Sequence, residues 1–131
     1  MKLLLDTHIW FWAVAEPERL SARIRRELAS PDNERWLSPI SVWEFLLLCR
    51  KGRIEVGGDP DAWLAATFRA FRTVEATVTF EVARETHRAN LPQRDPADIF
   101  LVASARIFGL TLVTADARLI ESKAVPVLAN R

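Results

Sequence analysis

Short apolar runs alternate along this chain with longer segments that carry apolar residues at helical spacing. The apolar runs predict strands at 2–6, 35–37, 73–77, 110–113 and 124–128. The intervening segments predict helices at 7–15, 22–29, 42–51, 60–71, 80–90 and 96–108, with a further short helix before the last strand. Apolar strands separated by helices are typical of a parallel sheet covered on both faces. The pattern therefore predicts a three-layer α/β/α domain.

Capping residues mark where several of these helices begin. Asp59 followed by Pro60, and Asp95 followed by Pro96, each combine a cap with a proline in the first helical turn. Ser21 is a similar cap for the helix at 22–29, and Ser41 is expected to open the helix at 42–51. Helix starts are therefore among the best-marked features of the sequence.

Length and composition limit the classes of function. The 131 residues predict one domain over 1–131, and the apolar runs are too short to span a bilayer. The first residues lack a secretory signal, so a cytoplasmic location is expected. Cys49 is the only cysteine, which excludes an internal disulfide and a cysteine-built metal site. A net charge of +1 gives no broad positive field, so any contact with nucleic acid must be local.

Four carboxylates occupy comparable places in the predicted fold. Asp6 and Asp116 end apolar strands, whereas Glu44 and Asp98 fall in first turns of helices. Both kinds of position lie on one rim of a parallel sheet, so the four acids are expected to converge. Two such charges ~4 Å apart repel by about 4 kcal/mol at an effective dielectric near 20, which a divalent cation would offset. Oxygen ligands without paired histidines or thiolates favour Mg²⁺ or Mn²⁺.

Each of these acids also has a purely structural interpretation. Ser41 and Glu44 match a capping box, and Asp98 is favoured by the dipole of its helix. Asp95 is expected to be an N-cap, while Asp6 and Asp116 could each serve a turn. Four later acids are expected to be ordinary surface charges: Glu75, Glu81, Glu85 and Glu121.

Four motifs together resemble a known family. They are LLLDT at 3–7, SVWE at 41–44, DPADIFLVA at 95–103 and LVTAD at 112–116. In this order and spacing they resemble the PIN domain family, and within it the VapC-type ribonuclease toxins of bacterial toxin–antitoxin pairs. The resemblance covers nearly the whole chain. Each motif is short, and the specificity lies in the ordered set.

The resemblance implies a metal-dependent endoribonuclease acting on RNA. Asp6, Glu44, Asp98 and Asp116 match the acidic positions of the family, and Thr114 matches its hydroxyl residue. It also implies a homodimer and a VapB-like antitoxin that inserts a segment into the active-site groove. Because Asp95 is an additional acid beside the third motif, it could be a ligand, a cap or both.

The expected mechanism follows from the placement of charge. The three matched aspartates would hold one or two metal ions, and Glu44 would bind the ion or orient the attacking water. In-line attack on phosphorus would then break a backbone ester. Hydroxyl groups expected to keep the carboxylates aligned are those of Thr114, Ser41 and, as a weaker candidate, Thr7.

Substrate contacts are predicted from local groups of cations. Arg50, Lys51 and Arg53 follow the helix that carries Glu44, while Arg88 and Arg94 lie near the loop before Asp98. Any of these could hold phosphate groups, although the first group could equally be a solvated helix end. The aromatic run at 10–12 could stack on bases, or belong to the core or a dimer interface.

Two other functions compete with the nuclease. An aspartyl-nucleophile phosphatase of the haloacid-dehalogenase type would also place Asp6 after the first strand, but it needs a second Asp where His8 stands. The other alternative is a non-catalytic protein-binding module that uses the apolar helix near Trp10. Metal-dependent cleavage of RNA distinguishes the three.

Overall fold

A computed structural model of the chain describes residues 1–89, 91 and 95–131. Five strands form, β1 (Lys2–Leu5), β2 (Glu34–Leu37), β3 (Val74–Glu75), β4 (Thr111–Thr114) and β5 (Val127–Ala129). The helices are α1 (Thr7–Ala15), α2 (Ala22–Ala29), α3 (Pro39–Arg50), α4 (Pro60–Ala70), α5 (Phe80–Glu85), α6 (Pro96–Phe108) and α7 (Ala117–Ser122). A short 3-10 helix, η1 (Pro17–Arg19), follows α1. The predicted alternation of strands and helices is confirmed.

The strands form one parallel sheet in the order β3-β2-β1-β4-β5. Strand β1 lies at its centre, where Leu4 is in register with Trp36 of β2 and Leu112 of β4. The order reverses at β1, because β2 and β3 extend the sheet on one side of β1 and β4 and β5 extend it on the other. In open α/β sheets such a switch point is where ligands bind, outside the carboxyl ends of the strands.

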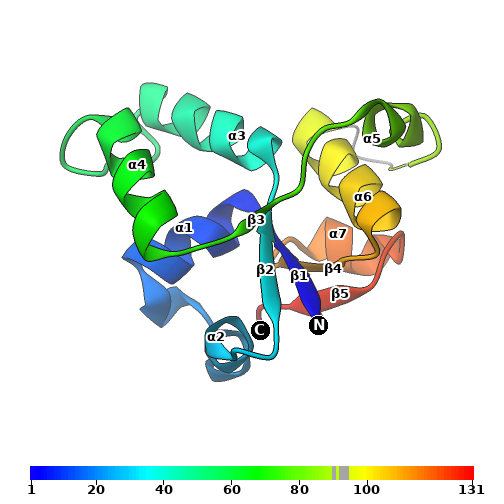
Figure 1. Ribbon diagram of the computed structural model, residues 1–131, viewed down its shortest axis with the longest axis horizontal. Helices are drawn as coiled ribbons and strands as arrows, with labels where there is room; N and C mark the ends of the chain where they lie inside the picture. The colour runs from blue at the N-terminus through cyan, green and yellow to red at the C-terminus, as the bar shows by residue number, and fades with distance from the viewer. Residues whose placement is uncertain (90, 92–94) are drawn as a thin grey trace.

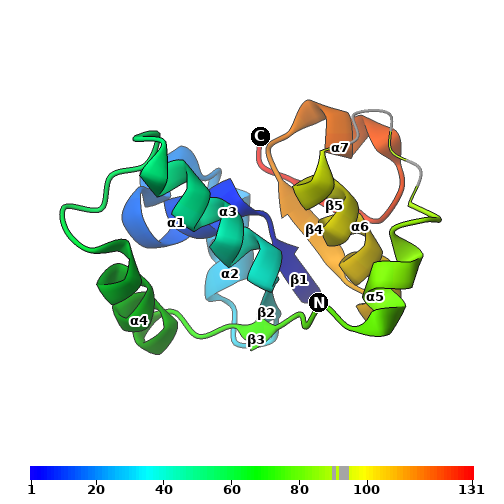
Figure 2. The same cartoon turned by 90° about the horizontal axis from the view of Figure 1, so that it is seen from above.

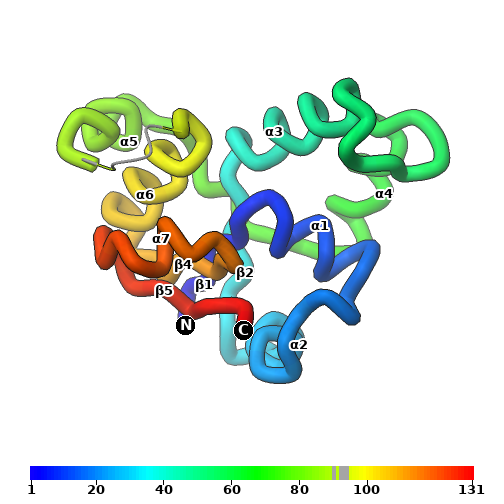
Figure 3. Tube along the Cα trace, turned by 180° about the vertical axis from the view of Figure 1, so that it is seen from behind, coloured from blue at the N-terminus to red at the C-terminus, as the bar shows by residue number. Residues whose placement is uncertain are grey.

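The sheet separates two apolar cores, with α1–α4 on one face and α5–α7 on the other (Figures 1 and 2). Side chains of β1 contribute alternately to the two cores, because successive residues of a strand point to opposite faces. Leu3 and Leu5 belong to the first core with Trp10 and Phe45, whereas Leu4 belongs to the second. The view from behind shows the same division (Figure 3). The predicted three-layer fold is thus confirmed.

Helix α3 begins earlier than the sequence pattern predicts. Its N-cap is Ser38, whose hydroxyl accepts a hydrogen bond from the amide of Ile40 at 3.0 Å, and Pro39 is the first helical residue. The prediction that Ser41 opens this helix is wrong, because Ser38 and Pro39 form the same cap-and-proline pair seen at 59–60 and 95–96. Glu44 therefore lies in the second helical turn, and the expected capping box does not form.

Other boundaries differ for local reasons. Strand β3 is shorter than predicted and has only two residues, which are both exposed. It is an edge strand of the sheet, and edge strands are often very short. Strand β5 begins after Pro126, which lacks an amide hydrogen for the sheet. Helix α5 ends at Glu85, and part of its predicted extent, residue 90, lies outside the described residues. Within the described part of the chain, no helix is long and apolar enough to cross a bilayer.

Glu85 is not the surface charge that the sequence suggested. It is 8% exposed, because α5 packs against α6. Its carboxylate pairs with Arg106 of α6 at 3.4 Å and with Arg88 at 3.2 Å. The burial of Glu85 is therefore accompanied by charge neutralisation across the two helices.

Candidate active site

Three aspartates cap helices at the carboxyl edge of the sheet. Asp6 accepts the amide hydrogen of Ile9 at 2.9 Å and so caps α1. Asp95 caps α6 and Asp116 caps α7, with oxygen-to-amide distances of 3.0 and 2.9 Å. Carboxylates are favoured at helix N-termini, where unpaired amides and the helix dipole attract negative charge. Local capping thus places one acid at the end of β1, a second after β4 and a third at the start of α6.

The predicted acids meet in one open pocket of about 460 Å³. Its lining residues are Asp6, Thr7, His8, Trp12, Glu44, Asp95, Asp98, Leu101, Ala115, Asp116, Arg118 and Leu119. They come from α1, α3, α6 and the segment from β4 into α7. The four acids that were predicted to converge, Asp6, Glu44, Asp98 and Asp116, therefore face a common space, together with Asp95.

Asp6 is the most firmly fixed of these acids. One oxygen accepts the Ile9 amide, and the other accepts the hydroxyl hydrogen of Thr114. Burial raises the pKa of Asp6 from 3.8 to about 6. The bonds from Thr114 and Ile9 oppose that rise, because they favour the charged form, whereas the nearby charge of Glu44 adds to it.

Asp98 is held in a less favourable environment. It is 9% exposed, and its Oδ2 atom has no hydrogen-bond partner among the described residues. Burial raises the pKa of Asp98 to about 7, and repulsion from Asp95 and Asp116 adds to the rise. A buried carboxylate oxygen without a donor is costly when charged, so this atom is suited to receive a cation.

Thr7 connects Glu44 to the same pocket. Its buried hydroxyl donates a hydrogen bond to Oε1 of Glu44, which joins α1 to α3. The expected contribution of Ser41 differs, because Ser41 is buried inside α3 and does not line the pocket. Its hydroxyl has no partner among the described residues. Thr7 and Thr114, not Ser41, are the hydroxyl residues that touch the carboxylates.

Arg118 is a pocket residue that the sequence analysis missed. Its guanidinium pairs with Asp116 through Nη2 and Oδ2 at 3.2 Å. Partial burial pushes the pKa of Asp116 upward, but hydrogen bonds and charge from Arg118 outweigh this and lower it overall. Its position two residues after Asp116 could have indicated this contact, because a side chain in the first turn of a helix can reach back to the residue that caps the helix.

Four of the five cations predicted to contact substrate lie outside the pocket, and the fifth is not among the described residues. Arg50, Lys51 and Arg53 lie at and beyond the C-terminal end of α3, and none of them lines the pocket. Arg88 pairs with Glu85 outside the pocket, and Arg94 lies outside the described residues. The aromatic run is divided, because Trp10 and Phe11 are buried in the core whereas Trp12 lines the pocket. Trp10 itself is fully buried, so a contact surface on this helix would have to use its other residues.

The donor chemistry of the pocket fits a hard divalent cation, although its oxygens are not yet arranged around one. Among the described residues, no three His, Cys, Asp or Glu side chains form a group that could already hold a metal ion. Oxygens of Asp6, Glu44 and Asp116 instead accept hydrogen bonds from Thr114, Thr7 and Arg118 respectively. The five carboxylates of the lining and the unpartnered Oδ2 of Asp98 match Mg²⁺ or Mn²⁺.

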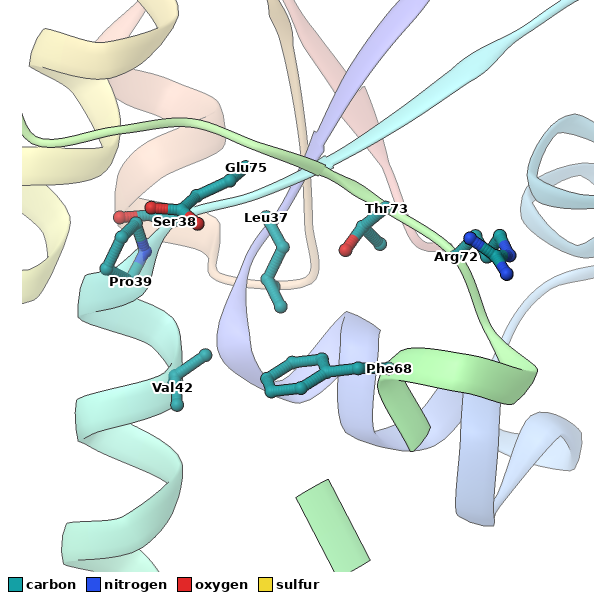
Figure 4. A pocket seen from close by; sticks show the side chains of 8 residues that line it. All are labelled: Leu37, Ser38, Pro39, Val42, Phe68, Arg72, Thr73 and Glu75. Carbon is teal, nitrogen blue, oxygen red and sulfur yellow. The ribbon is translucent and has the colours of Figure 1, made fainter. Parts of the chain in front are cut away.

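A second hollow of about 420 Å³ lies between the start of α3 and α4. In Figure 4 the side chains of Leu37, Val42 and Phe68 point toward one another across it. Arg72 and Glu75 are its charged lining residues, and none of the predicted catalytic acids reaches it. This hollow is therefore separate from the carboxylate pocket.

Comparison with known proteins identifies the family. The family model described as PIN domain matches residues 3–124. The chain belongs to the PIN domain family. This PIN domain is also 33% identical over 117 residues to Ribonuclease VapC22 of Mycobacterium tuberculosis, which covers 89% of this chain and 88% of the relative. The resemblance drawn from the four motifs is confirmed, and the haloacid-dehalogenase alternative is wrong.

Solved structures show the same fold. VapBC2 from Rickettsia felis, bound to a promoter DNA fragment, gives a TM-score of 0.70 at 15% identity, covering 98% of each chain. DNA-bound VapBC from Salmonella typhimurium gives 0.67 at 21% identity, covering 100% of this PIN domain and 99% of the other chain. VapBC-1 from nontypeable Haemophilus influenzae gives 0.68 at 14% identity, with 98% of each chain covered. The PIN fold thus persists where little sequence identity remains.

Proposed function

We propose that this chain is a VapC-type endoribonuclease that hydrolyses phosphodiester bonds of RNA with Mg²⁺ or Mn²⁺. The observation that carries the proposal is the meeting of five carboxylates in one pocket, where Asp98 is buried with an unpartnered oxygen. A structural role alone does not account for such a cluster, because burial and the charges of Asp95 and Asp116 disfavour the charged form of Asp98 and raise its pKa. The named ribonuclease among its relatives supports RNA as the substrate.

Asp6, Asp98 and Asp116 would hold the cation, and Glu44 and Asp95 are further candidate ligands from the same pocket. A bound divalent ion supplies neutralisation of charge on the phosphate and an acidified water. Asp98 must lose its proton before it can be a ligand, which its raised pKa delays until near neutral pH. The pocket residues therefore couple metal binding to pH.

The protein's own contribution is to fix the carboxylates in place. Thr114 and the Ile9 amide hold both oxygens of Asp6, so this side chain is prevented from rotating. Thr7 binds Oε1 of Glu44, which leaves the second oxygen to orient the attacking water and accept its proton. Water would then attack phosphorus in line with the ester oxygen that leaves.

A VapB-like antitoxin is the proposed protein partner. Support comes from similar structures described as VapBC complexes, and from the charge of the pocket, which would attract a basic antitoxin segment. The homodimer, the cytoplasmic location and the single domain over 1–131 stay predictions.

The test is cleavage mapping on total RNA with purified protein, with and without Mg²⁺. Discrete metal-dependent cuts that disappear in Asp98→Asn are the expected result. A small phosphoester such as p-nitrophenyl phosphate should remain intact, because the proposed enzyme hydrolyses RNA phosphodiesters with water and does not use an aspartyl nucleophile. If the folded protein neither binds Mn²⁺ by calorimetry nor cuts RNA, the non-catalytic protein-binding alternative replaces the nuclease.

A further inference from the structure

Arg118 is the one guanidinium among the described residues that line the carboxylate pocket. Its Nε lies 3.4 Å from Oδ1 of Asp116, and its Nη2 lies 3.2 Å from Oδ2. The guanidinium thus engages both oxygens of one proposed metal ligand. Its charge also lowers the pKa of Asp98, which places it within the field of the whole cluster.

These contacts compete with metal binding by Asp116. The oxygen Oδ1 already accepts the backbone amide of Arg118 at 2.9 Å, as the cap of α7. The oxygen Oδ2 has the guanidinium as its partner. A cation held by Oδ2 would therefore compete with Nη2 for this oxygen, whereas the hydrogen bond from the Arg118 amide to Oδ1, which caps α7, would be kept. The guanidinium can leave without unfolding the helix.

We propose that Arg118 binds a backbone phosphate of the RNA, and that Asp116 holds its guanidinium until a divalent cation takes that carboxylate. This inference rests on the proposed nuclease function. The Arg118 side chain is 60% exposed, so it has room to turn toward a ligand at the mouth of the pocket. Guanidinium groups bind phosphate oxygens through two parallel hydrogen bonds and keep their charge at every accessible pH.

The electrostatics of the pocket explain why such a group is needed. Five carboxylates repel an incoming phosphate, and a single divalent ion does not offset them all. His8 also lines the pocket, but it lacks the planar, permanently charged fork with which a guanidinium binds phosphate. Arg118 is the lining residue whose positive charge persists where the acids are ionised.

The test measures metal and RNA binding separately in Arg118→Gln, Arg118→Lys and the matched control Arg26→Gln. Arg26 is an exposed residue of α2 outside the pocket, so both Gln variants lower the net charge by one. Mn²⁺ affinity is measured by calorimetry. RNA affinity is measured by fluorescence anisotropy with a labelled single-stranded oligonucleotide in Ca²⁺, to allow binding without cleavage. Circular dichroism checks folding.

The proposal predicts opposite changes in the two affinities. Arg118→Gln should bind Mn²⁺ about 3- to 10-fold more tightly, because a competing positive charge is gone. The same variant should bind RNA about 10-fold more weakly, and its slope of log K against log salt should fall by about 0.7. Arg118→Lys should keep near-native Mn²⁺ affinity with an intermediate loss for RNA, because it retains charge without the bidentate fork. Arg26→Gln should change neither.

Two results would overturn the inference. Weaker Mn²⁺ binding in Arg118→Gln would mean that Arg118 only orients Asp116 as a ligand, and unchanged RNA affinity would mean that it does not contact phosphate. If the Gln variant does not fold, native-like RNA affinity in Arg118→Lys rejects the bidentate contact. Native protein that neither binds Mn²⁺ nor cuts RNA rejects the proposed function itself, which is a different outcome.

Discussion

Thr114 donates its hydroxyl hydrogen to Asp6, and the same oxygen accepts the backbone amide of Asp116 at 3.0 Å. The side chain is completely buried at the end of β4, next to the end of β1. One threonine thus links the carboxylate of Asp6 to the backbone of Asp116, near the other end of the sequence. Its position at the switch point of the sheet is what makes that link possible.

Replacing Thr114 with Val should impair the site more than the fold. The variant keeps the side-chain shape but removes the donor to Asp6, so unfolding free energy should fall by about 1–2 kcal/mol. Metal affinity or cleavage should fall by about 10- to 100-fold, as for other groups that orient metal ligands. The acidic limb of the cleavage profile should also move to higher pH, because the Thr114 bond lowers the pKa of Asp6.

Thr114→Ser is the matched control, since it restores the hydroxyl. It should recover most of the cleavage rate, measured on a defined RNA at saturating Mg²⁺. Equal activity in the Val and Ser variants would show that the hydroxyl does not position Asp6.

Asp98→Asn should stabilise the metal-free protein while it abolishes cleavage. The substitution removes a buried charge that burial and two neighbouring acids disfavour. We expect the unfolding free energy to rise by about 1–3 kcal/mol at pH 8, and by little at pH 4.5, where Asp98 is already protonated. Thermal unfolding at the two pH values measures the difference.

Asp61→Asn is the control for that experiment. Asp61 lies in the first turn of α4, as Asp98 does in α6, but it is exposed. Its replacement should lower stability by about 0.3–1 kcal/mol, because only a favourable dipole interaction is lost. A loss of stability in both Asp98→Asn and Asp61→Asn would contradict the hypothesis that the neighbouring acids repel Asp98.

Stability and metal binding should respond to pH in opposite directions. The native pKa values of Asp6 and Asp98, about 6 and about 7, exceed the ordinary value of 3.8, so the native state binds more protons between these limits. The contribution of these two protonated carboxyl groups to the free energy of unfolding of the metal-free protein is therefore greatest below pH 4. It is lost as the pH rises through 6 to 7.

Added Mn²⁺ should accordingly raise the melting temperature little at pH 5.5 and much more at pH 7.5, because the ligands must first lose their protons. Differential scanning calorimetry with and without the ion measures both effects. A metal-induced shift that is the same at both pH values would argue against Asp6 and Asp98 as ligands.

Glu85→Gln should destabilise the fold without affecting the metal site. Glu85 is buried between α5 and α6 and pairs with Arg106, so the change leaves that partner without its counter-charge. A loss of about 1–3 kcal/mol is expected, less than for a fully buried pair because Arg106 is partly exposed. Glu81→Gln on the exposed side of α5 should stay within about 0.5 kcal/mol in urea unfolding. If Glu85→Gln and Glu81→Gln had the same free energy of unfolding, the Glu85–Arg106 ion pair would not contribute to stability.

Local signals made much of the fold predictable. Helix α1 begins and ends at the predicted residues, because Asp6 caps it and residues 9–15 are all apolar. Helix α6 likewise runs from Pro96 to Phe108 and ends at Gly109, whose positive φ of 66° suits a residue without a side chain. The predicted start of α3 at Ser41 is wrong, because Ser38 caps the helix and Pro39 is its first residue.

The amino-acid sequence by itself determined where the strands and most helices lie and which acids stand at their ends, because capping and periodicity depend on residues within a few positions of one another. Only the tertiary structure decided that Thr114 fixes Asp6, that Arg118 enters the pocket and that Glu85 is buried. Those contacts depend on how the helices pack around the sheet. The sequence gives the type of each ionisable side chain. The burial of that side chain and its hydrogen-bond and charge partners depend on the neighbours that folding places around it.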